Sequence, residues 1–361
     1  MNALLGVIFH SIGGFASGSF YMPFSKVKGW AWESYWIIGG LFSWLIVPPL
    51  AAWLTIPGFA QIIGSTSTNI LSITYLMGLL WGIGGLTYGL GVRYLGMSLG
   101  NSVVLGFCSA FGALIPPIYY SINPTAGKIS FIHMLGNPGG RLVLLGVLVC
   151  LTGIAISGNA GWKKEKELTP EQTKASVQEF SLVKGLIIAV ISGILSSFFN
   201  FGIEAGKPMA IIANEAWKVA NPNQGEFLFQ NNVIFVVILW GGLTTNLIWT
   251  TILNFKNKTY SNFTDIKKPL LNNYFFAALA GTTWFLQFFF YGMGESKLGN
   301  GASSWILHMS TIILTANMWG LYNKEWKGVS SKTFRTFVVG IAVILLSVVI
   351  VAFGNSTLFN D

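Results

Sequence analysis

Long apolar runs separated by short polar breaks make up most of this 361-residue sequence. Only 9% of its residues are charged, whereas soluble domains carry about 25% charged residues. So few charges cannot cover a surface that faces water, and a helix of about 20 apolar residues is long enough to cross a lipid bilayer. The sequence therefore predicts an all-α membrane protein.

Ten apolar runs can be distinguished. We predict transmembrane helices over residues 3–22, 34–55, 71–91, 98–121, 141–160, 185–205, 231–254, 273–291, 304–322 and 336–354. The third and fourth runs are separated only by a short break around Arg93, and the sixth has the least distinct end. No basic region precedes the first run, so we interpret it as a retained helix and not as a signal peptide.

The 21 Lys and Arg residues are divided unevenly among the loops. Sixteen fall in the odd-numbered loops and five in the even-numbered ones. Because basic residues collect in cytoplasmic loops, we expect the odd-numbered loops in the cytoplasm and both termini in the periplasm of a bacterial inner membrane. A net charge of +9 would suggest nucleic-acid binding in a soluble protein, but here it reflects membrane orientation and predicts no nucleic-acid partner.

The longest charged break divides the chain into two sets of five helices. We predict a first half over residues 1–160, a cytoplasmic linker over 161–184 and a second half over 185–361. Because five is odd, the halves enter the membrane from opposite sides, which is the plan of an inverted repeat with a binding site between the halves. The halves share no convincing sequence identity, so this repeat is inferred from topology alone.

Ionisable side chains are costly inside a membrane and are therefore functional hypotheses by default. His10 lies in the middle of the first run and His308 near the start of the ninth. Histidine titrates near neutral pH and suits proton exchange. A neutral imidazole bonded to a backbone carbonyl is the alternative for each of them.

Two carboxylates lie at the ends of predicted helices and are further candidates for proton coupling. Glu33 begins the second helix, where it could equally pair in water with the lysines that precede it. Glu204 ends the sixth helix, and Lys207 follows it at the helical spacing of an ion pair. That spacing favours an interfacial pair over a coupling role for Glu204.

Polar amides lie within several of the runs and need partners in lipid, which another helix or a bound sugar can supply. These amides are Asn101, Asn200, Asn246, Gln287 and Asn317. Among them we place Asn200 and Gln287 in a predicted substrate site, because amides bind sugar hydroxyls.

Aromatic residues accompany these amides at helical spacing. Trp284, Gln287 and Tyr291 share one face of the eighth helix, and Trp81 and Tyr88 share one face of the third. Aromatic rings pack against the C–H patches of sugars, so these residues complete the predicted site. For any single Trp, a place in the interfacial belt or in helix packing is the alternative.

Glycine pairs in the third run indicate close helix packing. Gly78 and Gly82, and likewise Gly85 and Gly89, are spaced four residues apart. Small residues at this spacing let helix backbones approach closely in a membrane.

Several kinds of chemistry are missing from the sequence. It contains no P-loop, His-Glu-x-x-His or Cys-x-x-Cys motif. We therefore expect no cofactor, no metal and no enzymatic activity, and we interpret Cys108 and Cys150 as packing residues. A membrane enzyme would need a cluster of acids, bases or metal ligands, and a channel a polar ring; the predicted helices supply neither. No feature predicts an oligomeric state.

Several stretches closely resemble the bacterial L-rhamnose–proton symporters, a family of the drug/metabolite transporter superfamily. They run in order from the first predicted helix to beyond the ninth and cover nearly the whole chain. The matching stretches are Phe20–Trp32, Trp81–Gly100, Gly140–Gly153, Lys207-Pro208-Met209, Trp284–Tyr291, Trp305–Ser310 and Lys324-Glu325-Trp326.

The resemblance implies ten helices, an inner-membrane location and uptake of L-rhamnose driven by protons. Four candidates fall at positions that match the family: His10, Glu33, Gln287 and His308. Glu204 stands where the family has Asn, which argues against a general coupling role. The stretch after Tyr291 also differs from the family, so a carrier or exporter of another sugar or metabolite is the alternative function.

Overall fold

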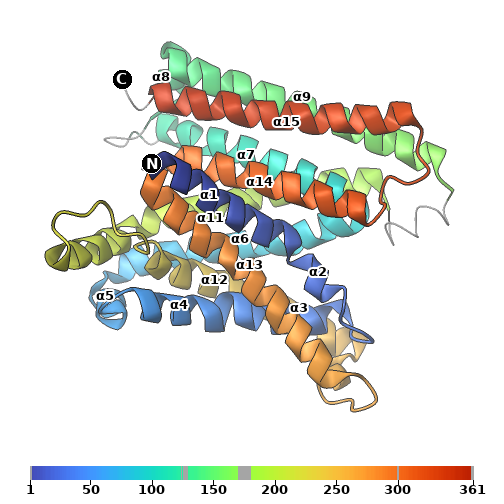
Figure 1. Ribbon diagram of the computed structural model, residues 1–361, viewed down its shortest axis with the longest axis horizontal. Helices are drawn as coiled ribbons and strands as arrows, with labels where there is room; N and C mark the ends of the chain where they lie inside the picture. Colours follow the sequence, from blue (N-terminus) through green and yellow to red (C-terminus); the bar gives the residue numbers. More distant parts are fainter. Residues whose placement is uncertain (1, 123, 125–128, 170–179, 299–300, 359–361) are drawn as a thin grey trace. The chain divides into compact units, whose positions relative to one another are not determined.

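The computed structural model describes residues 2–122, 124, 129–169, 180–298 and 301–358. Every regular element in these ranges is helical (Figure 1). A helix satisfies its own backbone polar groups, which is what lipid requires. Nine helical segments of the described chain are long and apolar enough to cross a membrane. The prediction of an all-α protein is thus confirmed.

The ninth predicted run coincides with helix α14, Gly301–Tyr322, which is not among these nine segments. His308, Thr311 and Asn317 are polar residues within it and lower its mean hydropathy. The sixth run is longer than predicted, because α11 extends over Leu182–Ala220 and continues through Pro208.

Two compact units make up the chain, and each is described by itself. The first comprises Met1–Ile83 and Phe198–Gly299. It holds the start of α6 (Thr68–Leu95), the end of α11 and the following complete elements: α1 (Asn2–Ser19), α2 (Tyr21–Phe24), α3 (Trp32–Gly40), a π-helical segment η1 (Leu41–Ile46), α4 (Val47–Thr55), α5 (Phe59–Ser65), α12 (Asn232–Asn257), a 3₁₀ turn η2 (Tyr260–Phe263) and α13 (Leu270–Leu298). Helix α13 packs against α1, α3 and η1.

The π-helical segment η1 precedes a Pro48-Pro49 pair at the start of α4. Proline has no backbone N–H and its ring crowds the carbonyl four residues earlier. A wider π turn relieves this conflict without ending the helix. It also places Trp44 of η1 where its ring contacts Trp284 of α13.

Glycines allow the helices of the first unit to touch through their backbones. A Cβ atom on Gly281 of α13 would overlap the carbonyl oxygen of Gly39 on α3. Gly78 and Gly82 of α6 lie in the same way against α12, which confirms close packing for that pair. Gly85 has open space around it, so the prediction was wrong for this residue.

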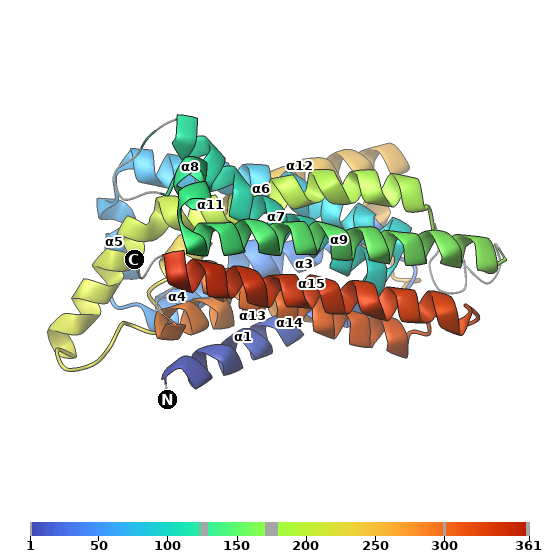
Figure 2. The same ribbon diagram turned by 90° about the horizontal axis from the view of Figure 1, so that it is seen from above.

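The second unit comprises Gly84–Ser197 and Asn300–Asp361. It holds the end of α6, the start of α11, and α7 (Met97–Ile122), α8 (Phe131–Gly136), α9 (Pro138–Glu167), α14 and α15 (Ser331–Leu358). Figures 1 and 2 show α9 and α15 side by side along their lengths. Gly153 of α9 faces Ile344 of α15, and Gly340 of α15 faces Ser157 of α9.

Each compact unit contains helices from before and after the linker predicted at residues 161–184. The boundaries between the units fall inside α6, at residues 83–84, and inside α11, at residues 197–198. Part of the predicted linker is helical, because α9 continues to Glu167 and α11 begins at Leu182.

Candidate functional site

One face of α13 gathers the polar and aromatic side chains of the first unit. These are Trp284, Gln287, Phe288, Tyr291 and Glu295; each lies three or four residues from at least one other, so they share this face. Gln287, Tyr291 and Glu295 are all buried. We call this set the α13 face.

Gln287 is held in place by hydrogen bonds at both ends of its amide. The Ser17 hydroxyl of α1 donates to Gln287 Oε1 at 2.8 Å, and Gln287 Nε2 donates to the Trp284 carbonyl at 3.0 Å. Within the described chain the second Nε2 hydrogen has no partner. A buried amide with one spare donor is suited to a sugar hydroxyl, because leaving that donor unpaired costs free energy.

Aromatic rings surround the start of the α13 face. The Trp284 ring lies 5.6 Å from the Trp81 ring and 5.8 Å from that of Trp44, between ring centroids. Phe199 and Phe288 stack at 4.2 Å, and both contact Trp81. Trp284 itself is only half-buried, so part of its surface can receive a ligand. The structure thus brings together the predicted residues Trp81, Trp284 and Gln287.

His10 of α1 packs against the middle of the α13 face. Its imidazole is fully buried and lies edge-on to the Tyr291 ring at 5.3 Å. It also lies over Gly294, where an added Cβ would come within 2.6 Å of His10 Nε2. Both predicted residues, His10 and Tyr291, therefore contact one another in the interior of the first unit.

The Gly294→Ala variant tests the position of His10. We expect α1 to shift on α13 and the His10–Tyr291 contact to break, because overpacking a site of this kind typically costs about 1–3 kcal/mol. Uptake per folded molecule should fall several-fold. The matched control is Gly158→Ala in α9, where the nearest atom would be 3.9 Å away; equal activity of the two variants would contradict this role for His10.

Glu295 is a buried carboxylate that was not among the residues predicted from the sequence. Lys207 Nζ of α11 lies 3.2 Å from Glu295 Oε1, and Asn231 Nδ2 donates to Glu295 Oε2 at 2.9 Å. Glu295 is only 6% exposed, whereas the Lys207 side chain is 41% exposed. A buried carboxylate therefore lies beside a cation whose side chain is partly exposed.

Glu295 was not predicted because the eighth helix was expected to end at residue 291. The helix continues to Leu298, so the Glu-Ser-Lys sequence that includes Glu295 is helical and belongs to the first unit. A sequence signal did exist: Glu295 stands four residues after Tyr291, on the face already formed by Trp284, Gln287 and Tyr291.

Glu33 lies at the start of α3, away from the α13 face. It is buried, and it accepts hydrogen bonds from Thr259 Oγ1 at 2.7 Å and Asn257 Nδ2 at 3.0 Å. The neighbouring Ser34 bonds to Asn254 at 3.0 Å. Both donors to the Glu33 carboxylate lie at the end of α12 and in the turn after it. Glu33 is thus placed as a structural connection between α3 and α12.

The remaining candidates of the first unit lie on α11. Glu204 is exposed and Asn200 is half-buried. The ion pair that the sequence predicted between Glu204 and Lys207 has a competitor, because Lys207 bonds to Glu295 of α13. A partner so distant in the sequence cannot be read from helical spacing.

Two candidates belong to the second unit. The Tyr88 hydroxyl of α6 donates to Asn101 Oδ1 of α7, and His308 of α14 is fully buried. In the same unit Asn317 Nδ2 of α14 donates to the Ser102 hydroxyl of α7 at 2.9 Å. Polar bonds between helices thus hold α6, α7 and α14. In the described ranges, no group of three or more His, Cys, Asp or Glu residues is placed to hold a metal ion.

Comparison with known proteins identifies the family of this chain. The family model described as L-rhamnose-proton symport protein (RhaT) matches residues 1–357. This chain belongs to that family. Proteins named L-rhamnose-proton symporter in Yersinia pestis (strain Pestoides F) and in Pectobacterium atrosepticum (strain SCRI 1043) are each 40% identical to it, over 97% of this chain and 98% of the relative.

Membership of the L-rhamnose-proton symport family confirms the resemblance seen in the sequence. The family is one of transporters and not of enzymes. Together with the nine candidate spans found among the described residues, it identifies the chain as a membrane protein. The match extends across α13, so the α13 face lies within the region that this family model covers.

Proposed function

We propose that this protein imports L-rhamnose together with protons across a bacterial inner membrane. The observation that carries the proposal is the family match over residues 1–357, with 40% identity to relatives named L-rhamnose-proton symporter. The α13 face supports it, because it combines an amide, a tryptophan ring and a buried carboxylate, and the Trp81 ring of the same unit lies beside Trp284.

We assign roles along the α13 face. Gln287, oriented by Ser17, binds a sugar hydroxyl. Trp284 and Trp81 provide apolar surface for the C–H groups and the methyl group of a 6-deoxy sugar. Glu295 carries the proton, beside Lys207. His10, His308, Glu33 and Glu204 are the other protonatable candidates from the sequence, and Tyr88, Asn200 and Tyr291 its other substrate candidates.

The proposal also includes the number and orientation of the transmembrane helices. We propose ten transmembrane helices with α14 as the ninth, five in residues 1–160 and five in 185–361, arranged as an inverted repeat within the drug/metabolite transporter superfamily. Both termini would be periplasmic. The sixteen basic residues of the odd-numbered loops support this orientation. Alkaline phosphatase fused to the carboxyl terminus should be active, whereas an active cytoplasmic reporter there would overturn the orientation.

The mechanism is alternating access linked to protonation. A proton on the carboxylate favours the sugar-bound state that can close, and by linkage the sugar tightens proton binding by the same factor. The test is to add L-rhamnose to de-energised cells in unbuffered medium. We expect external alkalinisation only in cells that express the protein; uptake without alkalinisation would exclude proton coupling.

A different sugar or metabolite is the second candidate substrate. The feature that favours it is the segment after Tyr291, which the resemblance noted in the sequence leaves unmatched and which supplies Glu295 to the α13 face. Competition of labelled L-rhamnose uptake by a panel of unlabelled sugars distinguishes the two. A sugar that competes at least tenfold better than L-rhamnose would replace it as the substrate.

The Gln287→Leu variant should raise the KM for L-rhamnose about 10–100-fold. The change keeps the volume but removes the amide, and a lost hydrogen bond in a buried site costs about 1–3 kcal/mol. Ser17→Ala should have a smaller effect, because it only loosens the amide. Gln61→Leu in the exposed part of α5 is the matched control. A KM unchanged in Gln287→Leu would remove this residue from the substrate site.

A further inference from the structure

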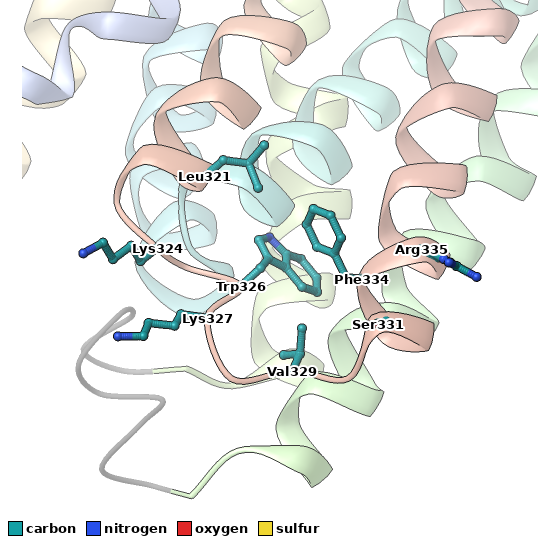
Figure 3. Close-up of a pocket in the computed structure, with 8 residues that line it drawn as sticks. All are labelled: Leu321, Lys324, Trp326, Lys327, Val329, Ser331, Phe334 and Arg335. Carbon is teal, nitrogen blue, oxygen red and sulfur yellow. The ribbon is translucent and has the colours of Figure 1, made fainter.

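A shallow pocket in the second unit lies where α14 ends and α15 begins (Figure 3). Its volume is about 510 Å³. Lys324 and Lys327 extend on one side of it and Arg335 on the other. All three cations are exposed, and none forms an ion pair with another described residue. Their charge is therefore available to a ligand.

The floor of the pocket is aromatic and fixed. Trp326 is buried, its indole N–H donates to the Ser98 hydroxyl at 2.8 Å, and its ring stacks on Phe337 at 3.9 Å. Phe334 lies beside Trp326 in the pocket (Figure 3). These contacts hold the Trp326 ring at the base of the pocket, so that it cannot move to cover the cations.

The two carboxylates close to the pocket are already engaged by other groups. Glu325 is buried and accepts from the backbone N–H and the hydroxyl of Ser98, at 3.0 and 2.8 Å. Glu167 accepts from the Ser330 backbone N–H at 2.6 Å and from the Thr333 hydroxyl at 2.5 Å. Neither carboxylate forms an ion pair with Lys324, Lys327 or Arg335 in the described chain, so the charge around the pocket favours an anion.

Apolar residues continue from the pocket along both helices. Leu321 lines the pocket, and Leu314 and Met318 precede it at helical spacing on α14; all three are exposed. Val338 and Val339 follow Arg335 on α15 in the same way and are exposed too. A ligand that fits both parts has an anionic head and an apolar tail.

We propose that this pocket binds the headgroup of an anionic phospholipid of the surrounding bilayer, with its phosphate drawn by the cations that flank the pocket and its acyl chains along α14 and α15. The membrane-spanning segment of α15 begins at Ser331, so the pocket lies at the level where headgroups are found. Basic pockets between transmembrane helices are known to hold such lipids. The site is separate from the residues proposed to bind sugar and proton.

The test is native mass spectrometry of the detergent-purified protein with phosphatidylglycerol or phosphatidylcholine added at equal concentration. We expect phosphatidylglycerol to bind preferentially and its binding to weaken with salt. The variant K324Q/K327Q/R335Q should bind it at least about tenfold more weakly, because each basic residue near an anionic lipid surface contributes roughly fivefold. Inorganic phosphate and glycerophosphoglycerol, which lacks acyl chains, serve as soluble competitors.

The matched control is K256Q/K258Q/K267Q, which removes the same charge from exposed residues at the end of α12 and in the turns after it. It should bind phosphatidylglycerol as the unchanged protein does. Equal losses in the two triple variants, equal binding of the two lipids, or full displacement by either soluble competitor would each overturn the proposal. Because all six residues are exposed, circular dichroism should show that both triple variants are folded. The salt dependence of phosphatidylglycerol binding is measured on the unchanged protein, so it tests the proposal independently of the variants.

Discussion

The Glu295→Gln variant should lose accumulation of L-rhamnose against its gradient and keep exchange of L-rhamnose across the membrane. Glutamine has nearly the same shape and can still bond to Asn231, but it cannot exchange a proton. For one proton per sugar, each pH unit across the membrane drives about tenfold accumulation. That ratio should fall to about one in the variant. Counterflow of labelled L-rhamnose measures the exchange that remains.

Glu33→Gln is the matched control for Glu295→Gln. It neutralises another buried carboxylate of the same unit, one that bonds to Asn257 and Thr259 at the end of α12. We expect it to retain accumulation driven by the pH gradient. If Glu33→Gln abolishes accumulation while Glu295→Gln does not, Glu33 is the proton carrier and the assignment made from the α13 face is wrong.

The Gly281→Val variant should prevent α3 and α13 from packing. A Cβ at Gly281 would overlap the carbonyl oxygen of Gly39, and backbone on both sides leaves nothing that can move aside cheaply. Overpacking of this kind costs about 1–3 kcal/mol or more, and it would displace the helix that carries the whole α13 face. We expect little folded protein and a clearly lowered Tm by thermal size-exclusion chromatography.

Gly85→Ala is the comparison for Gly281→Val. An added Cβ at Gly85 meets no atom within 4 Å, so yield, Tm and uptake should match the unchanged protein. A Gly281→Val protein with the same Tm as Gly85→Ala would show that α3 and α13 do not approach as closely as the structure has them.

The positions of most helices could be predicted from hydropathy alone. The run predicted at 231–254 is the helix Asn232–Asn257, and that at 98–121 falls in Met97–Ile122. Such runs can be recognised locally, because a segment that lies in lipid must be apolar and must satisfy its own backbone polar groups. The end of α11 was not predictable in this way: the sixth run was predicted to end at residue 205, just after Glu204, but the helix continues through Lys207 to Ala220.

The candidate site was predictable only where it follows helical spacing. Trp284, Gln287 and Tyr291 were found as one face, and the structure places Trp81 beside Trp284. The bond from Ser17 to Gln287 joins residues 270 positions apart, and the pair of Lys207 and Glu295 joins residues 88 positions apart. Partners at such distances are set by how helices pack, which periodicity along the chain does not encode.

Joint entry of L-rhamnose and protons is measured most directly with purified protein in liposomes, under an imposed pH difference that is acidic outside and with the membrane potential clamped. We expect labelled L-rhamnose to accumulate above its external concentration and a protonophore to abolish the excess. Uptake that only reaches the external concentration, whatever the pH difference, would contradict it.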